Sequence, residues 1–167
     1  TQELLEARRI DGAEQFFTRA IDFGYSKSAT ETFQIWDKQM LLSDVVYIIR
    51  KFQPDVIITR FPTTGEGGHG QHTASAILAL DAFDLAGDKN SFPEQLKDVE
   101  TWQPKRIFWN GWLPNLEANK TDLSKLLQID VGTYNKLLGK SYTEIAALSR
   151  SMHKSQGFGA TGRRGEN

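Results

Sequence analysis

The stretch DVIITRFPTTGEGGHGQH, residues 55–72, decides how this chain can fold. Its first five residues are rich in β-branched side chains and predict a short buried strand. The chain then turns at Pro62 into a glycine-rich loop that carries His69 and His72, after which we expect a helix. Open α/β sheets place their sites outside the carboxyl ends of strands, in loops of this kind. The candidate site is therefore this loop, which holds two of the three histidines.

The composition is that of an ordinary globular domain. The 167 residues are 39% hydrophobic and 25% charged, with a net charge of −1 and no cysteine. This length can bury a core without crosslinks, and disulfides and thiolate metal sites are excluded. The charge lacks the basic excess that favours a nucleic acid, and no apolar run is long enough to span a membrane.

Helical periodicity recurs outside the loop. Residues 2–12, 33–52 and 72–86 carry apolar side chains three and four positions apart, with a break expected near Ser43. Ser141 and Glu144 have the form of a capping box, which predicts a helix from residue 142 to about residue 154.

Four segments read as strands, and the polar stretch 88–104 between two of them reads as a loop anchored by Trp102. The order of elements favours an α/β fold with a mostly parallel sheet covered on both faces. The predicted strands are residues 13–23, 55–59, 106–112 and 126–131.

The glycines of the loop permit a nucleotide interpretation. Residues 65–70 (GEGGHG) match G-x-G-x-x-G, the pattern that cradles phosphate in dinucleotide-binding folds. In that motif the glycines follow the strand tightly, and an acidic residue ends the next strand about 20 positions on. Here residues 61–64 intervene, and residues 88–91 lie in a predicted loop, so the match is weak.

The histidines permit a second interpretation. Neutral imidazole is a common zinc ligand, and catalytic zinc takes three protein ligands with one position left open for water. Gly70 between His69 and His72 lets the two side chains take different roles. Alternatively, both histidines simply cap the helix or form polar surface, because no third ligand is visible in the spacing.

A family resemblance bears on this choice. The segments PDVIIT (residues 54–59) and GGHGQHTASA (residues 67–76) resemble the second motif of the LmbE-like, PIG-L-type zinc deacetylases. YTEIA (residues 142–146) and SRSMHKSQ (residues 149–156) are similar to the closing helix of that family. The resemblance implies a Rossmann-like three-layer α/β domain over residues 1–156, followed by a polar, glycine-containing tail over residues 157–167.

The resemblance also implies a reaction. It makes His72 a zinc ligand and places His69 to polarise the substrate carbonyl and stabilise the oxyanion. The implied activity is hydrolysis of the acetamide of an N-acetylated amino sugar or its conjugate, with a carboxylate relaying the proton of the zinc-activated water.

The chain also departs from the family pattern. The first family signature, His-Pro-Asp-Asp, supplies two zinc ligands and the carboxylate base, and it does not occur here. We therefore expect the first strand and the remaining ligands upstream of this chain, as part of a longer polypeptide. Lys27 replaces an acidic position that contacts sugar in some members, and Gly67 replaces an aromatic one, which leaves substrate preference open.

Weaker candidates surround the loop. Arg60 and Glu66 flank it and could touch a sugar, although such charges are usually solvated. His153 could approach the site from the last helix, but a histidine at a helix C-terminus more often interacts with the helix dipole. Gly65, Gly67, Gly68 and Gly70 shape the loop. The aromatic residues Phe108, Trp109 and Trp112 favour the core over a sugar platform.

Two other classes of function remain open from the sequence. A non-catalytic carbohydrate-binding or scaffolding domain would share the fold without using a metal. A nucleotide-binding module would place phosphate on the glycine loop.

Overall fold

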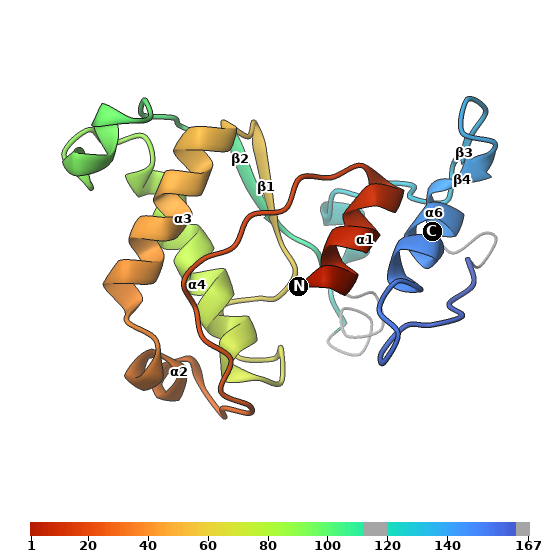
Figure 1. The fold of residues 1–167 in the computed structure, drawn as a ribbon, viewed down its shortest axis with the longest axis horizontal. Helices are drawn as coiled ribbons and strands as arrows, with labels where there is room; N and C mark the ends of the chain where they lie inside the picture. The colour runs from red at the N-terminus through yellow and green to blue at the C-terminus, as the bar shows by residue number, and fades with distance from the viewer. Residues whose placement is uncertain (112–119, 163–167) are drawn as a thin grey trace. The chain divides into compact units, whose positions relative to one another are not determined.

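The computed structural model describes residues 1–111 and 120–162 (Figure 1). Over these residues the chain is mixed α/β, with five α-helices and a small parallel sheet, so the predicted class is confirmed at that level. It divides into one unit of Thr1–Phe16 with Asp122–Asn167 and a second unit of Phe17–Thr121. The elements are α1 (Gln2–Asp11), α2 (Ala29–Ile35), α3 (Lys38–Phe52), β1 (Val56–Thr59), α4 (Gly70–Leu85), η1 (Pro93–Lys97), β2 (Arg106–Trp109), η2 (Leu123–Lys125), β3 (Tyr134–Asn135), β4 (Lys140–Ser141) and α6 (Tyr142–Arg150).

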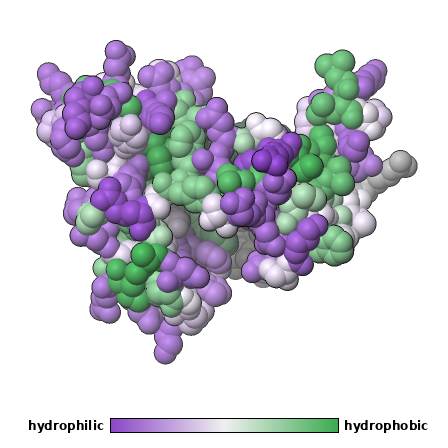
Figure 2. All heavy atoms as spheres, viewed as in Figure 1, coloured by the Kyte–Doolittle hydropathy of each residue, from purple (hydrophilic) through white to green (hydrophobic). Residues whose placement is uncertain are grey.

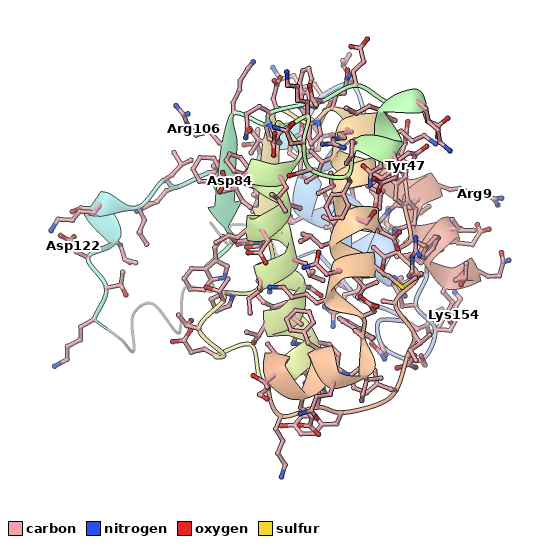
Figure 3. The ribbon with its side chains drawn as sticks, turned by 90° about the vertical axis from the view of Figure 1, so that its left-hand side faces the viewer. Arg9, Tyr47, Asp84, Arg106, Asp122 and Lys154 are labelled. Atoms are coloured by element: carbon pink, nitrogen blue, oxygen red, sulfur yellow. The ribbon has the colours of Figure 1, made fainter. Side chains whose placement is uncertain are left out.

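The core of the second unit lies between α3 and α4. These helices lie side by side in Figures 1 and 3, where Tyr47 marks α3 and Asp84 marks α4. Trp102 packs against this core, and its indole nitrogen donates to the Pro54 carbonyl oxygen at 2.8 Å, which confirms its predicted anchoring role. The buried members of the core are Leu41, Leu42, Val46, Ile49, Leu78, Ala82 and Ala86.

A buried arginine closes one end of this core. The Arg50 side chain is only 1% exposed, and its guanidinium donates to the carbonyl oxygens of Asp88 and Ser91, each at 2.8 Å. Burial lowers the pKa of Arg50, while the charges of Asp88 and Glu94 oppose that shift. Arg50 therefore holds the loop after α4 against α3.

The strand that leads into the histidine loop is β1. It pairs in parallel with β2, from Val56 opposite Arg106 to Thr59 opposite Trp109. Ile57 packs against the helical core, whereas Val56 and Ile58 are 45% and 62% exposed. The prediction of a buried strand is thus wrong for one face, because alternate residues of a strand point to opposite faces. A Rossmann-like three-layer arrangement is not confirmed by these two strands.

The first unit pairs α1 with α6. Gly12 ends α1 in the left-handed conformation, as predicted, with φ 74°. The capping box is also confirmed, because Ser141 accepts from the amide of Glu144 at 3.2 Å and the Glu144 carboxylate accepts from the amide of Ser141 at 2.7 Å. The helix that follows is shorter than predicted.

Two predicted strands are wrong. Residues 13–23 form no ladder, because their backbone bonds to side chains: Arg19 donates its amide to Asp44 at 2.9 Å, and Ile21 accepts from the Trp36 indole at 2.8 Å. Residues 126–131 are also unpaired, and Asp130 instead accepts from the amide of Gly132 at 2.7 Å in a local turn.

Two further boundaries differ from the prediction. The helix predicted over residues 33–52 is broken at Trp36 and Asp37, not near Ser43. The Asp37 carboxylate starts the new helix, α3, because it accepts a hydrogen bond from the amide of Met40. Trp112, the last residue of one predicted strand, lies outside the described residues. Within residues 1–111 and 120–162, no helix combines the length and the apolar content that a membrane crossing requires.

Candidate functional site

The histidine loop joins the carboxyl end of β1 to the first turn of α4. β1 ends at Thr59, His69 occupies the N-cap position, and α4 begins at Gly70, two residues earlier than predicted. The His69 side chain makes no capping hydrogen bond, so the imidazole is not used to close the helix. The strand, loop and helix thus place both histidines where open α/β folds bind ligands.

His72 is held on several sides. Its Nδ1 lies 2.7 Å from the carbonyl oxygen of Gly67, and the imidazole stacks on the Phe61 ring with 3.8 Å between centroids and 1° between planes. A Cβ atom on Gly67 would lie 3.1 Å from both the His72 Cβ and a Phe61 ring carbon. The half-buried His72 ring therefore has one defined position.

The hydrogen bond to Gly67 also determines which nitrogen of His72 is free. A carbonyl oxygen can only accept, so Nδ1 must carry the proton that is donated. In the neutral ring, Nε2 then keeps an unprotonated lone pair. Metal-ligating histidines commonly use this arrangement, with one ring N–H bonded to a carbonyl and the other nitrogen directed to the metal.

His69 lies beside His72 but in a more open position. The two ring centroids are 5.0 Å apart with the planes tilted by 40°. The His69 and Tyr25 rings pack in a T-shaped arrangement, with 4.8 Å between their centroids. The Tyr25 hydroxyl donates to the carbonyl oxygen of Gly68 at 3.4 Å. Phe61, His72, His69 and Tyr25 thus form a row of four rings, which we call the aromatic row.

A turn distant in the sequence holds the start of α4. The amide of Gly70 donates to the Ser26 carbonyl oxygen at 2.8 Å, and the Ser26 hydroxyl donates to Gln71 at 2.7 Å. Gln71 in turn donates to the Gly24 carbonyl oxygen. A Cβ atom at Gly70 would meet the backbone of Ser28, so only glycine fits there. These contacts fix the base of the histidine loop.

The other loop residues contribute less to this arrangement. Arg60 and Glu66 are exposed, and the Glu66 carboxylate accepts from the Thr64 hydroxyl. Gly65 and Gly68 adopt positive φ angles of 98° and 83°, which glycine tolerates at low cost.

His153 belongs to the other unit. Its Nδ1 lies 3.9 Å from the Glu3 carboxylate, three residues after the end of α6 at Arg150. His153 therefore lies beyond the end of the helix in which it was predicted, and both its role at the helix dipole and its role in substrate binding stay predictions.

Sequence reasoning found both histidines but not the groups that hold them. Tyr25 and Ser26 lie more than 40 residues before Gly68 and Gln71, which they contact, and only the family resemblance, at the neighbouring Lys27, pointed to that segment. Phe61 lies two residues after the strand, in the loop itself, and aromatic rings favour stacking on other rings, so it was an available signal.

The donor set for a metal is incomplete among the described residues. No group of three or more histidine, cysteine, aspartate or glutamate side chains in residues 1–111 and 120–162 is arranged to hold a metal ion. His72 alone has the chemistry of a prepared ligand, so the described chain fits zinc in part. Any complete site needs donors from elsewhere.

Comparison with family models, with curated proteins and with solved structures of other proteins found no match to this chain.

Proposed function

We propose that this chain is part of a zinc-dependent N-deacetylase, which hydrolyses the acetamide of an N-acetylated amino sugar or its conjugate. In this proposal the parallel pair β1–β2 belongs to a larger Rossmann-like three-layer sheet. The observation that carries the proposal is the hydrogen bond from His72 Nδ1 to the Gly67 carbonyl oxygen, because in the neutral ring it leaves the lone pair on Nε2. The resemblance of residues 54–76 to the deacetylase motif supplies the reaction class.

His72 is the proposed zinc ligand. The Phe61 stack and the Gly67 carbonyl fix the plane of its ring, so the lone pair on Nε2 has one direction and little entropy is lost when a cation binds. The remaining ligands and the carboxylate base would come from outside the described residues. A bound zinc would polarise the acetyl carbonyl and activate a water molecule.

His69 is the proposed oxyanion donor. Its ring is exposed and lies 5.0 Å from that of His72, close enough to reach a carbonyl held at the same centre. A protonated imidazole there would donate a hydrogen bond to the oxyanion as the amide carbon becomes tetrahedral. One well-aimed donor of this kind contributes about 3 to 4 kcal/mol to catalysis. Water would add to the amide carbon, and the proton taken up by the carboxylate base would pass to the nitrogen as the carbon–nitrogen bond breaks, giving acetate and the free amine.

The experiment separates the two histidines. Zinc titration by calorimetry, on a polypeptide extended to include the remaining ligands, should show tight zinc binding that His72→Ala abolishes. His69→Ala should keep the affinity and lower the rate of acetate release from an N-acetylglucosamine conjugate by about a hundredfold or more. Equal loss of zinc in both variants would contradict the assignment, as would an extended protein that releases no acetate.

One observation favours a carbohydrate-binding module as the second candidate. Tyr25 is 60% exposed at the end of the aromatic row, where a sugar ring could stack on it. Such a module would bind an N-acetylglucosamine conjugate equally well with and without a chelator. A nucleotide site is less favoured, because the amide of Gly70, at the start of α4, is already bonded to Ser26.

A further inference from the structure

The hairpin of β3 and β4 carries an unusual apolar end. β3 pairs antiparallel with β4, and Leu137 and Leu138 lie in the connecting turn with 97% and 57% of their surfaces exposed. In Figure 2 hydrophobic residues occupy the end of this hairpin, beside hydrophilic ones. We call residues 136–139 (KLLG) the hairpin tip. Two adjacent leucines that are exposed together form a small continuous apolar surface, and apolar surfaces bordered by polar residues mark interaction sites.

Three backbone amides of the hairpin tip are bonded within the hairpin. The Asn135 side chain accepts from the amides of Leu137 and Leu138 at 3.0 and 3.1 Å, and its carbonyl oxygen accepts from the amide of Gly139 at 2.9 Å. Gly139 closes the turn with φ 66°. A segment can enter an apolar medium cheaply only when its own polar groups are bonded internally, and these three amides meet that condition.

Charged and aromatic side chains border the leucines. Lys136 and Lys140 are exposed on either side of them, and residues 131–143 contain no acidic residue. Tyr134 and Tyr142, at the base of the hairpin, are 58% and 49% exposed. This order matches the layers of a membrane surface. The leucines would meet the acyl chains, the lysines the phosphate headgroups, and the tyrosines the interface with water.

We propose that the hairpin tip binds the surface of an anionic phospholipid bilayer, with Leu137 and Leu138 inserted among the acyl chains and Lys136 and Lys140 at the lipid phosphates. A bilayer fits better than a second copy of the chain, because a convex end with two leucines buries too little area for a stable dimer. The lysines on both sides complement an anionic surface, although the chain as a whole has a net charge of −1. This proposal does not depend on the deacetylase activity.

Because the chain contains no cysteine, a single introduced cysteine can be labelled at one chosen position. Leu137→Cys is labelled with an environment-sensitive fluorophore and mixed with vesicles of phosphatidylcholine and phosphatidylserine, or of phosphatidylcholine alone. The fluorophore should shift to the blue with the anionic vesicles. The matched control is Leu127→Cys, because Leu127 is also well exposed, at 69%, but lies outside the hairpin; its label should not shift.

Vesicle sedimentation tests the contribution of each side-chain type. Lys136→Gln with Lys140→Gln should weaken binding to the anionic vesicles by about thirtyfold, since each lysine near an anionic surface contributes about fivefold. Leu137→Asn with Leu138→Asn should weaken it by about a hundredfold. Circular dichroism checks that the variants keep the wild-type fold.

Three outcomes would overturn the proposal. In the first, the fluorophore shifts without lipid in a concentrated sample, which would indicate self-association. In the second, the labels at positions 137 and 127 shift equally. In the third, the variant that carries Leu137→Asn and Leu138→Asn binds anionic vesicles as tightly as the wild type.

Discussion

Replacing Gly67 by alanine tests how the His72 ring is held. The added Cβ would lie 3.1 Å from the His72 Cβ and 3.1 Å from a ring carbon of Phe61, which is tighter than ordinary contact. The two rings already stack at 3.8 Å, so neither can move without disturbing the other. Overpacking of this kind costs about 1 to 3 kcal/mol of stability. For a chain of this size the melting temperature should fall by about 2 to 12 °C.

The same substitution should also change the chemistry of His72. Moving the ring stretches or breaks the 2.7 Å hydrogen bond from Nδ1 to the carbonyl oxygen of residue 67. Loss of a partner that orients a ligand typically lowers metal affinity by about 10- to 100-fold. Thermal unfolding measures the first effect, and zinc titration of the extended polypeptide measures the second.

Gly68→Ala is the matched control for this prediction. Gly68 adopts φ 83° with open space around its Cβ position, so alanine there strains only the backbone. It should cost about 1 kcal/mol of stability and leave zinc affinity unchanged. If Gly67→Ala and Gly68→Ala lose stability alike and both keep wild-type zinc affinity, the reasoning about the His72 ring is refuted.

Two predictions concern the fold that supports the loop. Arg50→Met should destabilise the protein by about 3 to 5 kcal/mol in urea unfolding, because the carbonyl oxygens of Asp88 and Ser91 lose a buried cationic donor; a loss below about 1 kcal/mol would contradict this role. Burial by itself raises the pKa of Asp44, but the hydrogen bonds from the side chain and amide of Arg19 outweigh it and lower that pKa below 3.8. The ionised Asp44 therefore stabilises the fold fully above about pH 4, and this stabilisation is lost as the pH falls toward the lowered pKa. In urea unfolding, Asp44→Asn should make the free energy of unfolding depend less on pH on the acid side. An unchanged dependence would show that Asp44 is not the group responsible.

Local signals in the sequence predicted most of the longer helices and the strand that leads into the histidine loop. The β-branched run at residues 55–59 predicted β1, and helical spacing of apolar residues predicted α1, α3 and α4. The pair Ser141 and Glu144 predicted the start of α6. These signals act over a few residues, through side-chain sterics and hydrogen bonds to neighbouring amides. They also placed His69 and His72 in one loop at the end of a strand.

Long-range contacts explain what the sequence did not reveal. Residues 13–23 alternate like a strand, yet Asp44 and Trp36 provide side-chain partners for their backbone, and these partners lie on other elements. Residues 126–131 also alternate, but Asp130 bonds the adjacent backbone instead of leaving it free for a ladder. In the same way, Tyr25 and Ser26 joined the site through tertiary contacts that no local spacing encodes.

The aromatic row places the two histidines of the candidate site in different environments. Phe61 and Tyr25 stand at its two ends, and the histidines between them differ in environment: His72 is half-buried and bonded at Nδ1, whereas His69 is exposed. A half-buried ring with a fixed tautomer suits a ligand, and an exposed ring suits a group that meets the substrate. This difference is the physical basis for giving the two histidines separate roles.

The most direct test of the account is the protonation pattern of the His72 imidazole, measured by nitrogen NMR on the labelled protein. In the neutral ring, the account predicts a proton on Nδ1, none on Nε2, and a large change in the Nε2 shift when zinc is added to the extended polypeptide. A proton on Nε2, together with unchanged His72 signals at saturating zinc, would contradict the claim that this side chain is prepared to bind a metal.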